Sequence, residues 1–199
     1  RPLSERRALL EDIVSNAGQP MLTLSATLPF ASWEEIVAHR EHARTASIEG
    51  LMLKRLSSTY EVGRRRGDWW KWKVDPLSID AVLTFSMQGH GRRADLYTDH
   101  TFGLWHNGVL VTFAKAYSGL TDAEMKEVDA FVKKNTLERF GPVRQVKAEL
   151  VFEVAFEGIS ASTRHKSGVA VRFPRIARWR RDKKADEANT LDDLKAMIR

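Results

Sequence analysis

The first part of the chain carries two helical and two strand-like patterns. Apolar residues recur at helical spacing in Ser4–Val14, and a capping box at Ser32–Glu35 predicts a second helix that ends at about Arg44. Leu9, Leu10 and Ile13 lie on one side of the first helix, and the second helix is expected to bury Trp33, Ile36 and Val37. Two further apolar runs, Ile48–Arg55 and Trp69–Val74, predict strands.

A proline marks the end of this pattern. Pro76 lacks a backbone N–H donor and biases Asp75 to an extended conformation, so regular pairing is expected to stop here. Short strands separated by turns follow it; the predicted ones are Ile79–Met87, Thr101–Trp105, Val109–Phe113, Leu150–Glu157 and Val169–Phe173. We therefore place a domain boundary at about residues 75–78.

Turn and capping signals organise the second part. Asn107-Gly108 between two apolar runs is a strong signal for a β-hairpin. A capping box at Thr121–Glu124 predicts a helix, and Leu191–Ile198 predicts a closing amphipathic helix. The positions expected to face inward are Met125, Val128 and Val132 on the first of these helices and Leu150, Phe152, Val154 and Phe156 on one strand. Several strands with one inserted helix fit a small β-barrel.

Composition narrows the class of protein. The chain has no cysteine, which excludes disulfides and thiolate metal sites and suits a reducing cytoplasm. No apolar run approaches the roughly 18 residues of a membrane helix, so no membrane partner is expected. The six histidines form no H-E-x-x-H pattern, whereas Mg²⁺ needs only one or two carboxylates together with phosphates.

The positive charge is concentrated in two segments. The chain has a net charge of +6, but Arg64–Lys73 alone carries +4 and Arg164–Lys184 carries +8, so the rest is acidic. Two focused basic segments are typical of a site for a polyanion, whereas an isolated basic run is more often a solvated face.

Three residues of the first part have the chemistry of a nucleotide site. Lys71 and Lys73 are two residues apart, so in a strand they share one face while Trp70 and Trp72 pack into the core from the other. Two ammonium groups on one face suit a phosphate whose charge must be neutralised. Glu49 lies in the neighbouring strand-like run, where a carboxylate can hold Mg²⁺ beside phosphates.

The second basic segment is rich in arginine. Arg172, Arg175 and Arg178 recur every three residues, and Pro174 prevents an early helix. Guanidinium groups bind phosphate through two parallel hydrogen bonds, so a mobile segment of this kind can clamp a triphosphate or grip a nucleic-acid backbone.

These segments together resemble a known family. E-G-L-M-L-K at Glu49–Lys54, R-R-R-G-D-W-W-K-W-K at Arg64–Lys73 and R-F-P-R-I-A-R-W-R-R-D-K at Arg172–Lys183 resemble, in order and spacing, the last three nucleotidyltransferase motifs of bacterial ATP-dependent DNA ligases. P-L-S-E-R-R at Pro2–Arg7 is similar to the stretch after the third motif. The resemblance implies an α+β chain, with the C-terminal part of an adenylation domain at 1–77 and an OB-fold β-barrel at 78–199.

The resemblance also implies roles and partners. The implied enzyme joins 5′-phosphate and 3′-hydroxyl ends at nicks in double-stranded DNA, through enzyme–AMP and DNA–adenylate intermediates, and uses ATP and Mg²⁺. It is expected to be a cytoplasmic monomer. The implied roles are catalysis by Glu49, Lys71 and Lys73, metal binding by Glu49, nucleotide binding by Lys71, Lys73, Arg172, Arg175, Arg178 and Lys183, and DNA binding by Lys54, Arg64, Arg65 and Arg66.

One motif of the family is absent. Its nucleophile is the lysine of K-x-D-G, and the nearest string here, Lys73-Val74-Asp75-Pro76, has proline in place of glycine. The chain also lacks an initiator methionine. We therefore expect the C-terminal portion of a ligase, unable to adenylate itself, with the missing half supplied in cis or in trans.

Two other function classes fit part of the pattern. A non-catalytic OB-fold module that binds nucleic acid would explain the two basic segments, but neither Glu49 nor the Lys71–Lys73 spacing. An RNA ligase or capping enzyme shares the middle motifs, whereas R-F-P-R followed by D-K favours the DNA ligases.

Overall fold

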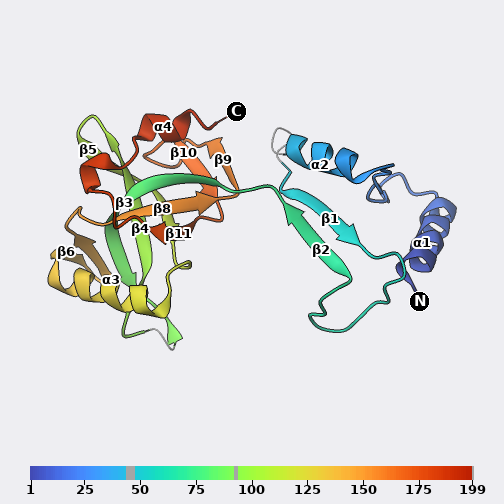
Figure 1. Ribbon diagram of the computed structural model, residues 1–199, viewed down its shortest axis with the longest axis horizontal. Coiled ribbons are helices and arrows are strands. Elements are labelled where there is room, and N and C mark those ends of the chain that lie inside the picture. The colour runs from blue at the N-terminus through green and yellow to red at the C-terminus, as the bar shows by residue number, and fades with distance from the viewer. Residues whose placement is uncertain (44–47, 92–93, 199) are drawn as a thin grey trace. The chain divides into compact units, whose positions relative to one another are not determined.

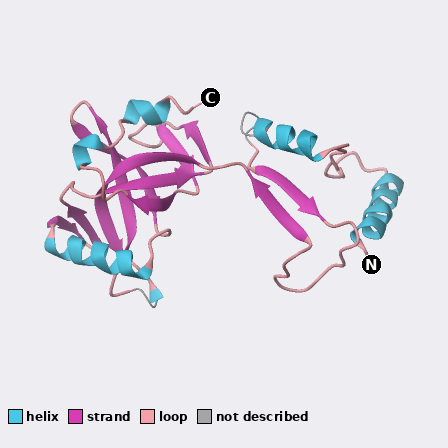
Figure 2. Cartoon of the chain, in the orientation of Figure 1, coloured by secondary structure: helices cyan, strands magenta, loops and turns pink. Residues whose placement is uncertain are grey.

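The chain divides between Val74 and Asp75 into two units, at the step where Pro76 interrupts the sequence pattern. This computed structural model describes residues 1–43, 48–91 and 94–198. The first unit combines two helices with a β-hairpin, and the second is built mainly of strands (Figures 1 and 2). Among the described residues, no helix is both long and apolar enough to cross a membrane.

The elements of the first unit agree with the sequence pattern in type and place. They are α1 (Leu3–Ala17), α2 (Trp33–His42), β1 (Gly50–Lys54) and β2 (Trp69–Lys73). The backbone N–H of Glu35 donates to the Ser32 hydroxyl at 3.2 Å and so caps α2. The predicted end of that helix, Arg44, lies outside the described residues.

The prediction that α2 buries Trp33, Ile36 and Val37 is wrong. Leu9, Leu10, Ile13, Trp33 and Val37 are exposed, and Ile36 is only half-buried. The reason is that the first unit has almost no interior: within its described part, Ala43 and Ser58 are the only buried residues. An apolar helix face without a core beside it stays in water.

Antiparallel pairing of β1 with β2 sets the faces of the hairpin. Lys73 lies opposite Gly50 and Lys71 opposite Met52, so both lysines share one face, as predicted. Trp72 lies on the other face, half-buried, with its ring edge toward Trp33 at 6.4 Å between centroids. Trp70 is 45% exposed, so its predicted place in a core is wrong.

Nine strands form the second unit together with three helices. The strands are β3 (Leu77–Gln88), β4 (Tyr97–His106), β5 (Val109–Ala116), β6 (Thr136–Phe140), β7 (Val143–Val146), β8 (Val151–Phe156), β9 (Gly158–Ala161), β10 (Val169–Arg172) and β11 (Arg175–Trp179), and the helices are α3 (Asp122–Lys134), the 3₁₀ turn η2 (Ala185–Glu187) and α4 (Leu191–Lys195), all within the described part of the chain. All pairings are antiparallel.

The long strand β3 is the centre of the main sheet and pairs with β4, β7 and β8. The order of the sheet is β11-β8-β3-β4-β5, with β7 pairing both β3 and β6, while β9 and β10 form a separate hairpin. The backbone N–H of Ile176 in β11 donates to the Ser118 carbonyl just after β5, at 2.9 Å. This bond joins the two ends of the sheet, as in a small barrel.

The turn and capping signals of the second unit are confirmed. Asn107 and Gly108 have φ of 51° and 78°, as the two-residue turn between β4 and β5 requires. Thr121 and Glu124 exchange both bonds of a capping box at the start of α3. The inward positions Met125, Val128 and Val132 are buried.

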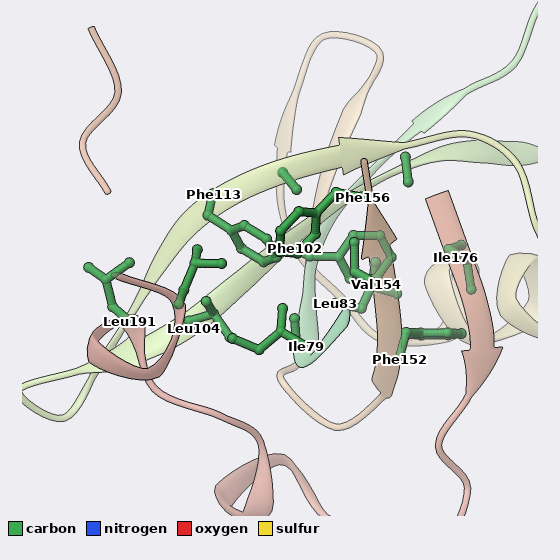
Figure 3. Packing of buried hydrophobic residues seen from close by; sticks show 14 of the residues in the cluster. Ile79, Leu83, Phe102, Leu104, Phe113, Phe152, Val154, Phe156, Ile176 and Leu191 are labelled. Atoms are coloured by element: carbon green, nitrogen blue, oxygen red, sulfur yellow. The ribbon is translucent and has the colours of Figure 1, made fainter. Parts of the chain in front are cut away.

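The core is apolar and rich in phenylalanine. Figure 3 shows Phe102, Phe113, Phe152 and Phe156 from three strands converging on one interior, with Leu83 and Val154 beside them. Phe152 meets Phe102 edge-on at 5.6 Å and stacks on Trp179 of β11 at 5.3 Å between centroids. The predicted inner face of β8 is therefore confirmed, although Val151 on its opposite face is buried too.

One titratable side chain lies inside this core. His100 of β4 is buried, and its Nδ1 is 2.9 Å from the Ser86 hydroxyl. Its Nε2 has no hydrogen-bond partner among the described residues. Burial lowers the pKa of His100 to about 4, because the charged imidazolium loses its hydration.

Candidate functional site

One face of the β1–β2 hairpin carries Lys71 and Lys73, and we call it the lysine face. An ion pair lies on this face. Glu49 immediately precedes β1, and its carbonyl accepts a hydrogen bond from Val74 N–H at 3.0 Å, which holds it beside the end of β2. The Lys73 ammonium then lies 3.4 Å from the Glu49 carboxylate. The sequence predicted both residues separately, and the structure brings them together.

Glycine at position 50 makes this close approach possible. Gly50 has φ of 134°, and a Cβ atom there would collide with the carbonyl oxygen of Trp72 and the Cα of Lys73. Only glycine adopts this conformation without strain. Gly50 therefore lets β1 approach β2 closely enough for the Glu49 carboxylate to lie beside Lys73.

An arginine missed by the sequence analysis supports the same strand end. Arg40 of α2 donates to the carbonyl of Lys73 from Nε at 2.9 Å, and its guanidinium lies over the Trp72 ring at 5.3 Å. These contacts tie α2 to β2 where Lys73 begins to face solvent. No sequence motif marks Arg40, because the contact is made to a backbone atom far along the chain.

The remaining predicted residues of this unit are exposed. Lys71 lies on the lysine face and is exposed. The Lys54 ammonium lies 4.4 Å from the centroid of the Trp69 ring. The Arg64–Arg66 run lies in the irregular connection between β1 and β2. Lys71 and these arginines have no ion pair with any residue that the structure describes.

A β-bulge in β11 determines which face of the strand carries Arg175 and Arg178. In a regular strand, residues three apart point to opposite faces, but β11 carries a register shift between Ile176 and Arg178. The extra residue turns Arg178 to the face of Arg175, while Ile176 and Trp179 stay with the core residues of β8. The three-residue spacing of the motif thus gives one arginine face on a strand.

Each arginine on that face meets a carboxylate. Arg175 donates to Glu157 at 2.9 Å, and Arg178 donates to Glu153 in β8 at 2.7 Å. The Glu157 side chain is 7% exposed, whereas that of Arg178 is 63% exposed. An arginine–carboxylate pair places the guanidinium in the geometry that it would offer to a phosphate.

A strained turn separates Arg172 from Arg175. Phe173 has φ of 52°, which is uncommon for a residue with a Cβ, and its side chain is exposed. The guanidinium of Arg172 lies 5.0 Å from the centroid of the Phe173 ring. Pro174 lies between β10 and β11, so a strand and not a helix follows it.

The end of the basic segment is held by one buried acid. Asp80 of β3 accepts from Arg180 at 2.6 Å and from Lys183 at 2.7 Å, both at the same carboxylate oxygen. Arg180 also donates to Asp182, and this hydrogen bond lowers the pKa of Asp182 to about 2. Arg181 pairs with Glu127 of α3 and stacks over Trp179 at 3.9 Å.

The sequence marks Asp80 as a residue that needs a partner, but it does not mark Glu153 and Glu157 in this way. Asp80 is the one charged residue of β3 and lies between the apolar Ile79 and Ala81, and such a residue needs a partner when it is buried. Glu153 and Glu157 look like ordinary polar positions at the edge of an alternating pattern.

The residues present suit only one kind of metal site. Across residues 1–43, 48–91 and 94–198, no three His, Cys, Asp or Glu side chains cluster as they would to enclose a metal ion. A single carboxylate such as Glu49 does fit Mg²⁺ that is held mainly by phosphates and water.

Comparisons with known proteins match both parts of the chain. Residues 1–73 match the family model described as the ATP dependent DNA ligase domain, and residues 93–183 match the ATP dependent DNA ligase C terminal region. A probable DNA ligase of Koribacter versatilis is 39% identical over all of this chain, and a DNA ligase of Methanoculleus marisnigri is 33% identical over 98% of it.

The fold comparison points the same way. A structure from a study of DNA binding by Lig E DNA ligases superposes with a TM-score of 0.65 at 17% identity, covering 90% of this chain and 59% of that one. The predicted α+β fold with an OB-type barrel is thereby confirmed. The chain spans 38% of the Koribacter relative and 34% of the Methanoculleus relative. With both ligase models matched along its length, the chain belongs to the ATP-dependent DNA ligase family.

Proposed function

We propose that this chain serves an ATP-dependent DNA ligase as the part that neutralises and orients phosphate. The reaction joins 5′-phosphate and 3′-hydroxyl ends at a nick in three phosphoryl-type transfers, through enzyme–AMP and DNA–adenylate intermediates. The observation that carries the proposal is the lysine face of the first unit, where Lys71 and Lys73 point the same way and Glu49 lies 3.4 Å from Lys73.

The lysine face is suited to the α-phosphate. Negative charge must be neutralised there as each nucleophile approaches, and Lys71 and Lys73 supply two positive charges on one face of the hairpin. Arg40 and Gly50 fix the backbone that presents Lys73. Glu49 is the residue that would hold Mg²⁺, which when bound supplies further charge neutralisation at the phosphates.

The arginine face of β11 is suited to the pyrophosphate end of ATP. Arg175 and Arg178 already present their guanidinium groups to carboxylate oxygens, and a phosphate can replace a carboxylate with little change of geometry. Arg172 and Lys183 are proposed to contact the same group. Their role belongs to self-adenylation, the step in which pyrophosphate leaves.

The exposed cations of the first unit are proposed to contact DNA. Lys54 and the Arg64–Arg66 run lie on or beside the β1–β2 connection, open to solvent. Contacts of this kind bind the phosphate backbone without reading sequence, and they weaken as salt rises. The substrate is nicked double-stranded DNA in the cytoplasm, bound by a monomeric ligase.

The nucleophile must come from outside these residues. The sequence contains no K-x-D-G, so the lysine that attacks ATP is proposed to lie on a segment joined to this chain or on a separate one. The 199-residue chain alone should therefore form no covalent AMP adduct.

Nick sealing with ATP and Mg²⁺ tests the proposal. The comparison is between this chain alone and the same chain extended upstream through the K-x-D-G segment, with labelled ATP to detect the adduct. We expect adduct and sealed DNA from the extended form only. Sealing by neither form, with salt-dependent DNA binding retained, would instead support the OB-fold binding module. An adduct on the chain alone would refute the assignment of the nucleophile.

A further inference from the structure

We propose that Asp80 is a positioning residue for self-adenylation: it holds Arg180 and Lys183 at the end of the basic segment, so that Lys183 is directed toward the triphosphate. This inference rests on the proposed function. It assigns a role to a residue that lies about 90 positions upstream of the arginine-rich motif and outside every motif discussed above.

The position of Asp80 is unusual for a carboxylate. It lies in β3 between Ile79 and Ala81, which are both buried, and its own side chain is 9% exposed. Its Oδ2 atom accepts from the Arg180 Nη1 at 2.6 Å and from the Lys183 Nζ at 2.7 Å. A buried carboxylate is tolerated when it is paired and hydrogen-bonded, and Asp80 has two cations as partners.

Backbone hydrogen bonds fix both ends of the segment that Asp80 anchors. Arg180 N–H donates to the Val151 carbonyl at 2.8 Å, which joins the start of the segment to β8. At its far end, Asn189 N–H donates to the Asp80 carbonyl at 3.0 Å, and Asp80 N–H donates to the Asn189 side chain at 3.1 Å. The loop of residues 180–189 is therefore held to β8 at its start and to Asp80 at its end.

Within this loop the two cations differ in what they leave available. Arg180 is 15% exposed and donates to two carboxylates, those of Asp80 and Asp182. Lys183 is 29% exposed, and an ammonium has three N–H donors. One bond to Asp80 leaves two donors of Lys183 for phosphate oxygens, so the contact orients the lysine without consuming it.

A neutral residue could not do the same. Asparagine at position 80 could still accept hydrogen bonds, but it would not compensate the two positive charges beside it. Arg180 would keep Asp182, whereas Lys183 has no second carboxylate among the described residues. Loss of the Asp80 charge should therefore release Lys183 before it releases Arg180.

The test uses the ligase that carries this chain together with the K-x-D-G lysine. The variants are Asp80→Asn, Lys183→Met and the two combined, with Glu127→Gln as a matched control that removes an exposed carboxylate from Arg181. Two rates are measured for each: self-adenylation with ATP, and sealing of a nick that is already adenylated. The second reaction does not involve the triphosphate.

We expect Asp80→Asn to slow self-adenylation by at least about tenfold and sealing of the adenylated nick by less than about threefold. The combined variant should be no slower than Lys183→Met alone, because both changes remove the same interaction. Glu127→Gln should match the wild type in both reactions.

Three outcomes would overturn the inference. Equal losses in both reactions would show a structural role for Asp80, and additive losses in the combined variant would show that it does not act through Lys183. Unchanged self-adenylation in Asp80→Asn, with an active wild type, would remove it from the reaction. An inactive wild type would instead refute the proposed function itself, and this inference with it.

Folding of the single variant must be controlled. If Asp80→Asn does not fold, Asp80→Asn with Arg180→Gln removes both charges of the more buried pair and leaves Lys183 without its anchor. The same selective loss of self-adenylation is expected from this pair, and an unchanged rate would contradict the inference.

Discussion

The two basic segments of this chain lie on supports of opposite kinds. Arg64–Lys73 ends on a two-stranded hairpin in a unit with almost no buried residues among those described. Arg172–Lys183 contains the strand β11, which packs on a phenylalanine-rich core, and Arg175, Arg178 and Lys183 each meet a carboxylate. The difference is in how the positive charge is held in place.

The two basic segments are similar in composition, but their cations are held in place in different ways. In the first unit, contacts of Arg40, Gly50 and Val74 with the backbone at the strand ends hold Lys73 in place. Its ammonium forms an ion pair with Glu49. In the second, ion pairs to β3 and β8 orient the cations directly. An anion that approaches Arg178 must displace a carboxylate, whereas one that approaches Lys71 meets no ion-pair partner among the described residues.

The largest expected effect is on stability. Phe152→Ala in the second unit should lower the free energy of unfolding by about 3–5 kcal/mol, because Phe152 is fully buried between Phe102 and Trp179. Trp70→Ala in the first unit should cost about 1 kcal/mol or less, since nearly half of that side chain is already in water. Urea unfolding of both variants measures the difference, and equal losses would contradict the contrast between the two units.

The next effect concerns pH and belongs to the second unit alone. The folded-state pKa of His100, about 4, is below its ordinary value near 6.5, so the unfolded chain binds the extra proton first as the pH falls. Stability should be fully present above about pH 6.5 and decline by up to about 3 kcal/mol toward pH 4. His100→Gln should flatten this profile in unfolding experiments between pH 7 and 4. A profile that keeps its slope in the variant would assign the effect to other groups.

A smaller effect separates the two arginines of β11. Arg175→Gln removes one charged partner of the Glu157 carboxylate, whose side chain is 7% exposed, and should lower the free energy of unfolding by about 1–2 kcal/mol. Arg178→Gln should cost about 0.5 kcal/mol or less, because that pair is exposed. Thermal unfolding of the two variants at one pH compares them, and the reverse order would refute the role assigned to burial.

The smallest effect is on DNA binding. Arg65 has no ion pair within the described part of the chain, so it is available to DNA phosphate. Arg65→Ala should reduce the slope of log K against log salt by about 0.9, one phosphate contact. Lys133→Ala, which removes a cation already paired with Asp129, should leave the slope unchanged. Equal changes in both variants would mean that binding follows net charge alone.

Much of this architecture follows from local sequence signals. The capping boxes at Ser32 and Thr121 and the turn at Asn107-Gly108 depend on neighbours within a few residues, and all three form as predicted. Period-two spacing also places Lys71 and Lys73 on one face. These features can be read from sequence because their physical causes are short in range.

What the sequence could not predict depends on distant partners. The strand β11 was not predicted, since alternation fails where the bulge between Ile176 and Arg178 inserts an extra residue. The ion pair between Asp80 and Lys183 joins positions far apart in the chain. The exposed face of α2 was mispredicted because amphipathic spacing shows which side of a helix is apolar, and does not show whether a core lies beside it.

We propose that the lysine face contacts the α-phosphate and that the arginine face contacts the pyrophosphate. The measurement that tests it most directly compares Lys73→Ala with Arg178→Ala in the ligase that carries the K-x-D-G lysine. Self-adenylation and sealing of an adenylated nick are measured for each variant. Lys73→Ala should slow both reactions by at least about tenfold, because the α-phosphate takes part in both. Arg178→Ala should slow self-adenylation at least about tenfold more than sealing, and equal losses in the two reactions would contradict the account.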